Sequence, residues 1–113
     1  AERAVEQIGA PALSAGWLTA QSFRRPFDLV VNCLGGGAEE LVESLPIAAL
    51  PETAIWVDIN YWMTDPPRLA ACRARGLRVS DGLGMLLHQG ALSFELFTGY
   101  PVEASELRRV LKL

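Results

Sequence analysis

Three short runs rich in apolar residues, separated by segments with helical spacing, dominate the pattern of hydrophobic and polar positions. They cover 27–33, 54–58 and 77–80, with the sequences FDLVVNC, AIWVD and LRVS. Short apolar runs are typical of strands in a parallel sheet, which is buried on both faces. Strands that alternate with helices predict an α/β fold in which helices flank the sheet. A further, very short strand is predicted over 11–14.

Helix signals fill the intervals between these runs. Pro66 and Pro67 suit the first turn of a helix, because proline lacks only an N–H group that would be unpaired there. Gly76 and Gly99 are expected to end helices, since glycine readily adopts the left-handed conformation of a helix C-terminus. The predicted helices are 1–8, 38–45, 68–75, 83–98 and 105–111, the fourth being the longest and the last amphipathic.

Composition limits the class of protein. The 113 residues are 50% hydrophobic and 20% charged, which favours one folded domain over a disordered chain. A net charge of −3 and a pI near 5.1 argue against binding to nucleic acid. The apolar stretches are far shorter than the roughly 20 residues of a membrane span, and no secretory signal is seen, so we expect a cytoplasmic protein. Two cysteines without a CxxC pair, beside one histidine, predict neither a disulfide framework nor a metal site.

The segments after the three runs are the candidate ligand-binding region, because ligands of open parallel sheets bind beyond the carboxyl ends of the strands. These segments are 32–37 (NCLGGG), 58–61 (DINY) and 81–85 (DGLGM). Their glycines would allow a ligand to approach the backbone closely, and Tyr61 adds a hydroxyl group on an apolar body. The alternative is that all three are ordinary strand-to-helix turns.

The glycine run matches a phosphate-binding loop only weakly. Gly35 and Gly37 fit the first two glycines of GxGxxG, but Glu40 stands in the third place. Glu39 and Glu40 would lie in the first turn of the next helix and would repel a pyrophosphate. A flexible turn is therefore favoured over a phosphate cradle.

Helical spacing sorts the side chains of the longest helix into faces. Gly82, Met85 and Gln89 share one face, which is expected to open toward the strand ends. The Gln89 amide could bind a polyhydroxy ligand or a backbone group, whereas His88 is predicted to be a surface residue rather than a general base. A neighbouring stripe is predicted to pack on the sheet; it comprises Leu83, Leu86, Leu87, Gly90, Ala91 and Phe94.

No catalytic residue is predicted within the chain. It has one histidine, no GxSxG motif, and no paired carboxylates in a convincing cleft position. Its single lysine, Lys112, is next to the last residue.

Taken together, DLVVNC, VDINY and PPRLAACRARGLRVSDGLGMLLHQGALSFELFTG resemble the C-terminal part of shikimate dehydrogenases. The resemblance implies a substrate domain followed by a Rossmann-like NADP-binding domain. Residues 1–113 would be the C-terminal part of that second domain, including its C-terminal helices but lacking its first two strands. Tyr61 and Gln89 match substrate-contacting residues of the family, and Ile59, Gly82 and Met85 match positions beside the nicotinamide.

Some residues depart from the family pattern. Leu34 and Gly35 stand where the family usually has Thr and then Ser or Pro, and Pro66 replaces a threonine. The loss of a hydroxyl group facing the cofactor is expected to weaken NADP binding. Family chains are more than twice as long, and their catalytic Lys and Asp, with the glycine-rich cofactor turn, precede the part matched here. Lys112 cannot replace that lysine.

Two functions follow as hypotheses. The first is the C-terminal segment of an enzyme that interconverts 3-dehydroshikimate and shikimate with NADP in aromatic amino acid biosynthesis, and that is not catalytic alone. The strand over 28–33 would lack a neighbour, so we expect it to be completed by the missing N-terminal part or by self-association. The alternative is a truncated, non-catalytic remnant that serves as an oligomerising or ligand-holding module.

Overall fold

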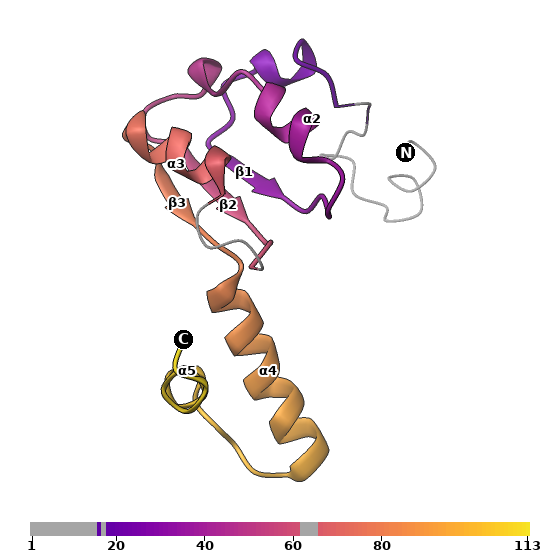
Figure 1. The fold of residues 1–113 in the computed structure, drawn as a ribbon, viewed down its shortest axis with the longest axis vertical. Helices are drawn as coiled ribbons and strands as arrows, with labels where there is room; N and C mark the ends of the chain where they lie inside the picture. Colours follow the sequence, from indigo (N-terminus) through magenta and orange to yellow (C-terminus); the bar gives the residue numbers. More distant parts are fainter. Residues whose placement is uncertain (1–15, 17, 62–65) are drawn as a thin grey trace.

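The computed structural model describes residues 16, 18–61 and 66–113, and its centre is a parallel three-stranded sheet (Figure 1). The predicted helix over 1–8 and the predicted strand over 11–14 lie outside the described residues. The strands lie in the order β1-β2-β3, and Asn32 at the end of β1 is the register partner of Asp58 at the end of β2. Their bounds are Leu29–Asn32 (β1), Ile55–Asp58 (β2) and Arg78–Ser80 (β3). The predicted parallel α/β fold is confirmed.

The helices of the described part lie close to their predicted positions. Pro67 is the first residue of its helix, and Gly76 and Gly99, which follow two helices, have positive φ angles of 84° and 75°. Local sequence signals therefore set most of the boundaries. The helices are η1 (Ser22–Arg24), α2 (Glu39–Ser44), η2 (Ile47–Ala49), α3 (Pro67–Ala74), α4 (Leu83–Thr98) and α5 (Ala104–Leu111).

The hydrophobic core lies on one face of the sheet. Trp56 in the central strand is completely buried, and its ring centroid lies 6.0 Å from that of Phe23. Helices α2 and α3 lie side by side over this face and supply much of the cover (Figure 1). The buried core residues are Phe23, Val42, Leu45, Leu50, Ala54, Trp56, Leu69, Cys72 and Leu77.

The opposite face of the sheet is not sealed by the described part of the chain. Leu29 and Val31 of β1 are 55% and 47% exposed, and Ile55 and Val57 of β2 are only half-buried. The prediction that β1 is a buried strand is thus wrong for this structure. Its apolar pattern is that of a strand covered on both faces, but only one face is covered here.

Helix α4 leaves the sheet and forms an arm with α5 (Figure 1). Leu87 and Ala91 are its buried residues, and Leu107 of α5 approaches the same side, with Cδ1 3.8 Å from where a Cβ on Gly90 would lie. The predicted packing of the apolar stripe on the sheet is therefore wrong, because α5 covers part of it instead and Phe94 stays 45% exposed. No helix within the described ranges is long and apolar enough to cross a membrane.

Candidate functional site

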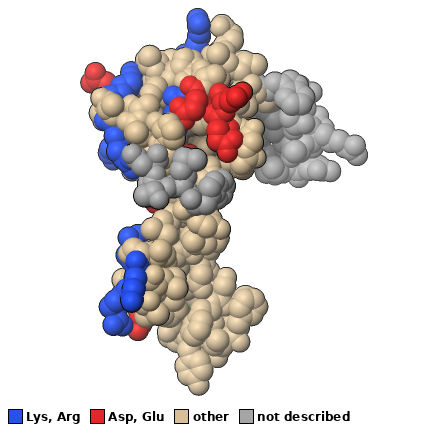
Figure 2. All heavy atoms as spheres, in the orientation of Figure 1, with Lys and Arg blue, Asp and Glu red and all other residues tan. Residues whose placement is uncertain are grey.

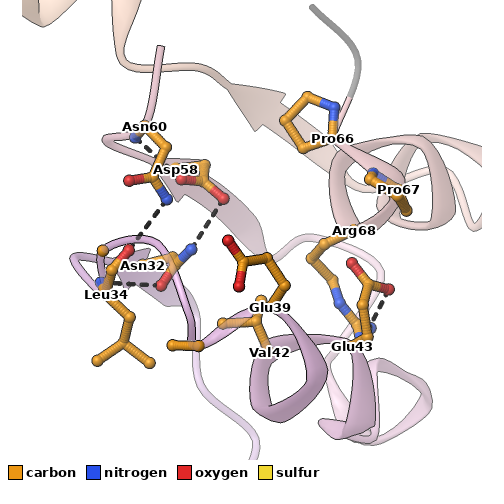
Figure 3. A pocket seen from close by; sticks show the side chains of 12 residues that line it. Asn32, Leu34, Glu39, Val42, Glu43, Asp58, Asn60, Pro66, Pro67 and Arg68 are labelled. Atoms are coloured by element: carbon orange, nitrogen blue, oxygen red, sulfur yellow. Dashed lines mark hydrogen bonds and ion pairs between the residues drawn. The ribbon is translucent and has the colours of Figure 1, made fainter. Parts of the chain in front are cut away.

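A buried polar pair joins the carboxyl ends of β1 and β2. Asn32 is 8% exposed and Asp58 is 3% exposed, and Asn32 Nδ2 donates a hydrogen bond of 2.9 Å to Asp58 Oδ2 (Figure 3). The contact follows from the parallel register, which places these two residues opposite each other with their side chains on the core face. Polar groups so deeply buried are costly unless they are hydrogen-bonded, so the pair fixes the two strand ends relative to each other.

The same two side chains hold the loops that follow the strands. Asp58 Oδ1 accepts the N–H of Asn60 at 3.0 Å, and Asn32 Oδ1 accepts the N–H of Leu34 at 3.1 Å. Asn60 Nδ2 closes the network by donating to the Leu34 carbonyl at 3.1 Å (Figure 3). Sequence reasoning missed this network, although polar residues directly after apolar strands are a signal that could have revealed it.

Gly82 and Ile59, two of the predicted site residues, are in direct contact. The Gly82 N–H donates to the Asn60 carbonyl at 3.2 Å. A Cβ added at Gly82 would lie 1.9 Å from the Ile59 carbonyl oxygen, far inside van der Waals contact. The φ of Gly82 is −77°, an ordinary value, so glycine is needed here for space and not for backbone freedom. The start of α4 thus lies directly on the loop after β2.

The other predicted site residues remain at the surface. Tyr61 is 51% exposed on the loop after β2, and Met85 is 47% exposed in the first turn of α4. Gln89, one turn further along α4, is also exposed. Ile59 and Gly82 are therefore brought into contact with each other, while Tyr61, Met85 and Gln89 are accessible to a ligand.

A small cavity lies between the strand ends and helices α2 and α3 (Figure 3). Its volume of about 60 Å³ has room for water molecules. Arg68, which is 4% exposed, borders it, donates to the Leu45 carbonyl at 3.2 Å and lies 3.7 Å from a Glu43 carboxylate oxygen. The Arg68 guanidinium also lies 5.7 Å from the centre of the Trp56 ring, a cation–π contact. Arg68 thus contacts both the hydrophobic core and this cavity.

The glycine turn after β1 already has an anionic partner within the chain. Gly37, with a φ of 93°, donates its N–H to Glu39 Oε2 at 2.7 Å. Acidic side chains also gather over α2 (Figure 2), whose first turn contains Glu39 and Glu40. These carboxylates agree with a turn that does not hold a phosphate group.

The remaining reactive side chains of the described residues do not form a cluster. In the ranges 18–61 and 66–113, no group of three His, Cys, Asp or Glu residues could hold a metal ion. His88 is exposed, as predicted, and borders a groove between α4 and α5. Cys33 is exposed, whereas Cys72 is buried, and this burial raises the pKa of the Cys72 thiol.

Comparison with known sequences identifies relatives over almost the whole chain. Residues 82–112 match the model of the shikimate 5'-dehydrogenase C-terminal domain. The shikimate dehydrogenase (NADP(+)) of Nitrobacter winogradskyi is 38% identical over 109 residues, which cover 95% of this chain and 39% of that protein. The Nitrobacter hamburgensis enzyme is 38% identical over 116 residues, covering 99% and 40%. The chain therefore spans about two fifths of the length of these relatives.

Solved structures show the same relationship. Shikimate 5-dehydrogenase from Thermus thermophilus, in complex with shikimate, matches with a TM-score of 0.62 and 33% identity, over 85% of this chain and 37% of that one. Quinate dehydrogenase from Corynebacterium glutamicum, in complex with NAD, matches with a TM-score of 0.71 and 26% identity, over 96% and 40%. In sequence and in fold, this chain matches the C-terminal part of shikimate dehydrogenases.

Proposed function

We propose that residues 1–113 form the C-terminal part of the NADP-binding domain of a shikimate dehydrogenase-type enzyme. Such an enzyme interconverts 3-dehydroshikimate and shikimate. The observation that carries the proposal is the contact of Gly82 with the Ile59 carbonyl, because it joins the DINY and DGLGM segments into one surface at the strand ends. Both segments belong to the part of the chain on which the resemblance rests.

Each predicted site residue takes a role in binding. Tyr61 and Gln89 hydrogen-bond the hydroxyl groups of a shikimate-like substrate, since both residues are exposed and each side chain can donate and accept. Ile59, Gly82 and Met85 lie beside the nicotinamide of NADP, which accepts the hydride when bound. The half-buried Ile59 and the exposed Met85 side chain fit this ring, because they offer apolar surface at the carboxyl ends of the strands.

Proton transfer is assigned to groups outside the chain. Lys112 directly follows α5, and it does not match the family's catalytic lysine, which precedes the part matched here. The chain's own residues orient the substrate and the nicotinamide, and such positioning contributes to the rate only when the reacting groups are also supplied. We therefore expect no turnover by these 113 residues alone.

The open surfaces of the sheet support completion by a further polypeptide. The outer edge of β1 is unpaired within the described part, and exposed Leu29 and Val31 lie on that strand. A largely apolar groove of about 270 Å³ runs beside it, bordered by Leu18, Val31 and Leu34 among others. Unpaired strand edges and apolar patches bind other chains. An N-terminal part, or a second copy of this chain, would cover them.

A chimera tests the proposed function. The part of the Nitrobacter winogradskyi enzyme that precedes the matched region is joined to this chain, and NADP reduction is followed at 340 nm with shikimate present. We expect no reduction by the chain alone and steady turnover by the chimera. Turnover by the chain alone would refute the division of labour, and a folded chimera that binds shikimate but never reduces NADP would favour the non-catalytic module. The Leu34-Gly35 departure is the observation that favours this second candidate.

A further inference from the structure

The buried carboxylate of Asp58 links the three loops that carry the proposed site. Its Oδ2 accepts from Asn32 Nδ2 at 2.9 Å and its Oδ1 accepts from the Asn60 N–H at 3.0 Å. Asn60 in turn contacts both other loops: its side chain donates to the Leu34 carbonyl at 3.1 Å, and its own carbonyl accepts the Gly82 N–H at 3.2 Å. Through Asn60, the Asp58 side chain is thus linked to the loop after β1 and to the start of α4.

We infer that Asp58 is a positioning residue for the proposed reaction, acting through Asn60 on the loop that carries Ile59 and Tyr61 and on the first turn of α4. The inference rests on the proposed function of the site. Asp58 is 3% exposed, so it acts from below the surface and is not expected to touch a ligand. Ile59 lies between Asp58 and Asn60, and its backbone N–H donates to the Asn32 carbonyl at 3.1 Å. The Ile59 carbonyl group in turn lies in close contact with Gly82.

An Asp58→Asn substitution keeps the size of the side chain but breaks its hydrogen-bonding pattern. Asp58 accepts at both oxygens, whereas an asparagine presents one acceptor and one donor group. The new NH₂ group must face either Asn32 Nδ2 or the Asn60 N–H, both of which are donors. If the Asn32 amide turns over to accept, its own NH₂ group then faces the Leu34 N–H. One hydrogen bond is lost in every arrangement, and a buried donor remains unpaired.

A second substitution restores the pattern without restoring the charge at position 58. In the Asn32→Asp, Asp58→Asn double variant, the new amide donates to the new carboxylate, and its oxygen still accepts the Asn60 N–H. The other oxygen of the new carboxylate accepts the Leu34 N–H. Every hydrogen bond of the network is kept, while the negative charge moves from β2 to β1. The double variant therefore separates positioning from a requirement for charge at position 58.

Two readouts test the inference. Amide hydrogen exchange of the chain reports on the loops, with the Trp56 amide in the central strand as a control for global unfolding. We expect Asp58→Asn to speed exchange at Asn60 and Gly82 while leaving Trp56 unchanged. In the chimera it should lower kcat/KM for shikimate roughly tenfold or more, the effect of one lost hydrogen bond and an unpaired buried donor. The double variant should recover both loop protection and kcat/KM.

The possible failures have different meanings. If the double variant recovers the exchange pattern but not kcat/KM, a charge at position 58 is required and the positioning role is overturned. If Asp58→Asn changes neither readout, or speeds exchange equally at Trp56, the inference is also overturned. If the unsubstituted chimera is inactive, the proposed function fails and the role of Asp58 in the reaction falls with it. The exchange measurements then still decide whether Asp58 orders the three loops.

Discussion

The contact between Gly82 and the Ile59 carbonyl predicts that Gly82→Ala lowers the free energy of unfolding, which is the opposite of the usual effect. A Gly→Ala change at an ordinary φ such as −77° normally stabilises a protein by about 0.4–1 kcal/mol, because it reduces the freedom of the unfolded chain. At Gly82, however, the new Cβ would lie 1.9 Å from the Ile59 oxygen and 2.3 Å from its carbonyl carbon. These are backbone atoms and cannot rotate away, so the loop after β2 and the start of α4 must separate. Overpacking of this kind costs about 1–3 kcal/mol, and we expect Gly82→Ala to destabilise the chain by that amount.

Gly84→Ala is the matched control, two residues further along. It lies inside α4, and an added Cβ would meet no atom within 4 Å apart from its chain neighbours and the backbone of its own helix. We expect it to stabilise by about 0.5–1 kcal/mol, the usual gain of alanine over glycine in a helix. Urea unfolding followed by far-ultraviolet circular dichroism gives both free energies by linear extrapolation. Equal stabilisation by the two substitutions would show that the close approach of the loops is not real, and the proposed site would lose its central contact.

Four further predictions concern individual side chains. Gln89→Ala in the chimera should raise KM for shikimate by up to about tenfold with little change in kcat, since one neutral hydrogen bond contributes about 0.5–1.5 kcal/mol; an unchanged KM would remove Gln89 from the site. Arg68→Leu should leave the free energy of unfolding within about 1 kcal/mol in urea, because its partner Glu43 is 40% exposed and can be hydrated; a loss above about 3 kcal/mol would mean that the guanidinium itself holds the core. Burial raises the pKa of the Cys72 thiol. The stabilising contribution of this thiol is therefore complete below the ordinary thiol pKa and is lost as pH rises through the raised pKa. Cys72→Ala should accordingly flatten the fall in stability at alkaline pH. In iodoacetamide labelling, exposed Cys33 should react in the native state and Cys72 only after unfolding; early labelling of Cys72 would contradict its burial.

Local signals explain what could be predicted from the sequence. The bounds of α4 agree with the predicted helix over 83–98, because Gly99 adopts the left-handed conformation that its position suggested. The start of α3 at Pro67 follows from the fixed φ of proline in the same way. Signals of this kind act within a few residues and need no knowledge of the rest of the molecule.

Partners distant in sequence explain what could not be predicted. Spacing identified an apolar stripe on α4 but could not say that α5, rather than the sheet, would cover part of it. In the same way, the composition of β1 suggested burial, but burial depends on a neighbour that the described part of the chain does not supply. Much of the α4–α5 arm is uncharged in one view (Figure 2), and Leu92, Leu96 and Phe97 are 69%, 82% and 84% exposed.

In the candidate site, too, single residues could be predicted from the sequence, whereas contacts between distant residues could not. The sequence predicted Ile59, Tyr61, Gly82, Met85 and Gln89 as site residues, but their spacing could not show that Gly82 contacts the Ile59 carbonyl. The hydrogen bond between Asn32 and Asp58 could not be predicted either, because it depends on the register of two strands that are separated in sequence. Side-chain pairs of this kind become visible only when the strands are aligned.

We propose that these strand ends and the first turns of α4 form one wall of a ligand-binding chamber whose opposite wall is supplied by another polypeptide segment. A crystal structure of the chimera with shikimate and NADP tests it most directly. We predict hydrogen bonds from Tyr61 and Gln89 to shikimate, and the nicotinamide against Ile59, Gly82 and Met85. Shikimate bound elsewhere, with Tyr61 and Gln89 facing bulk solvent, would contradict the claim.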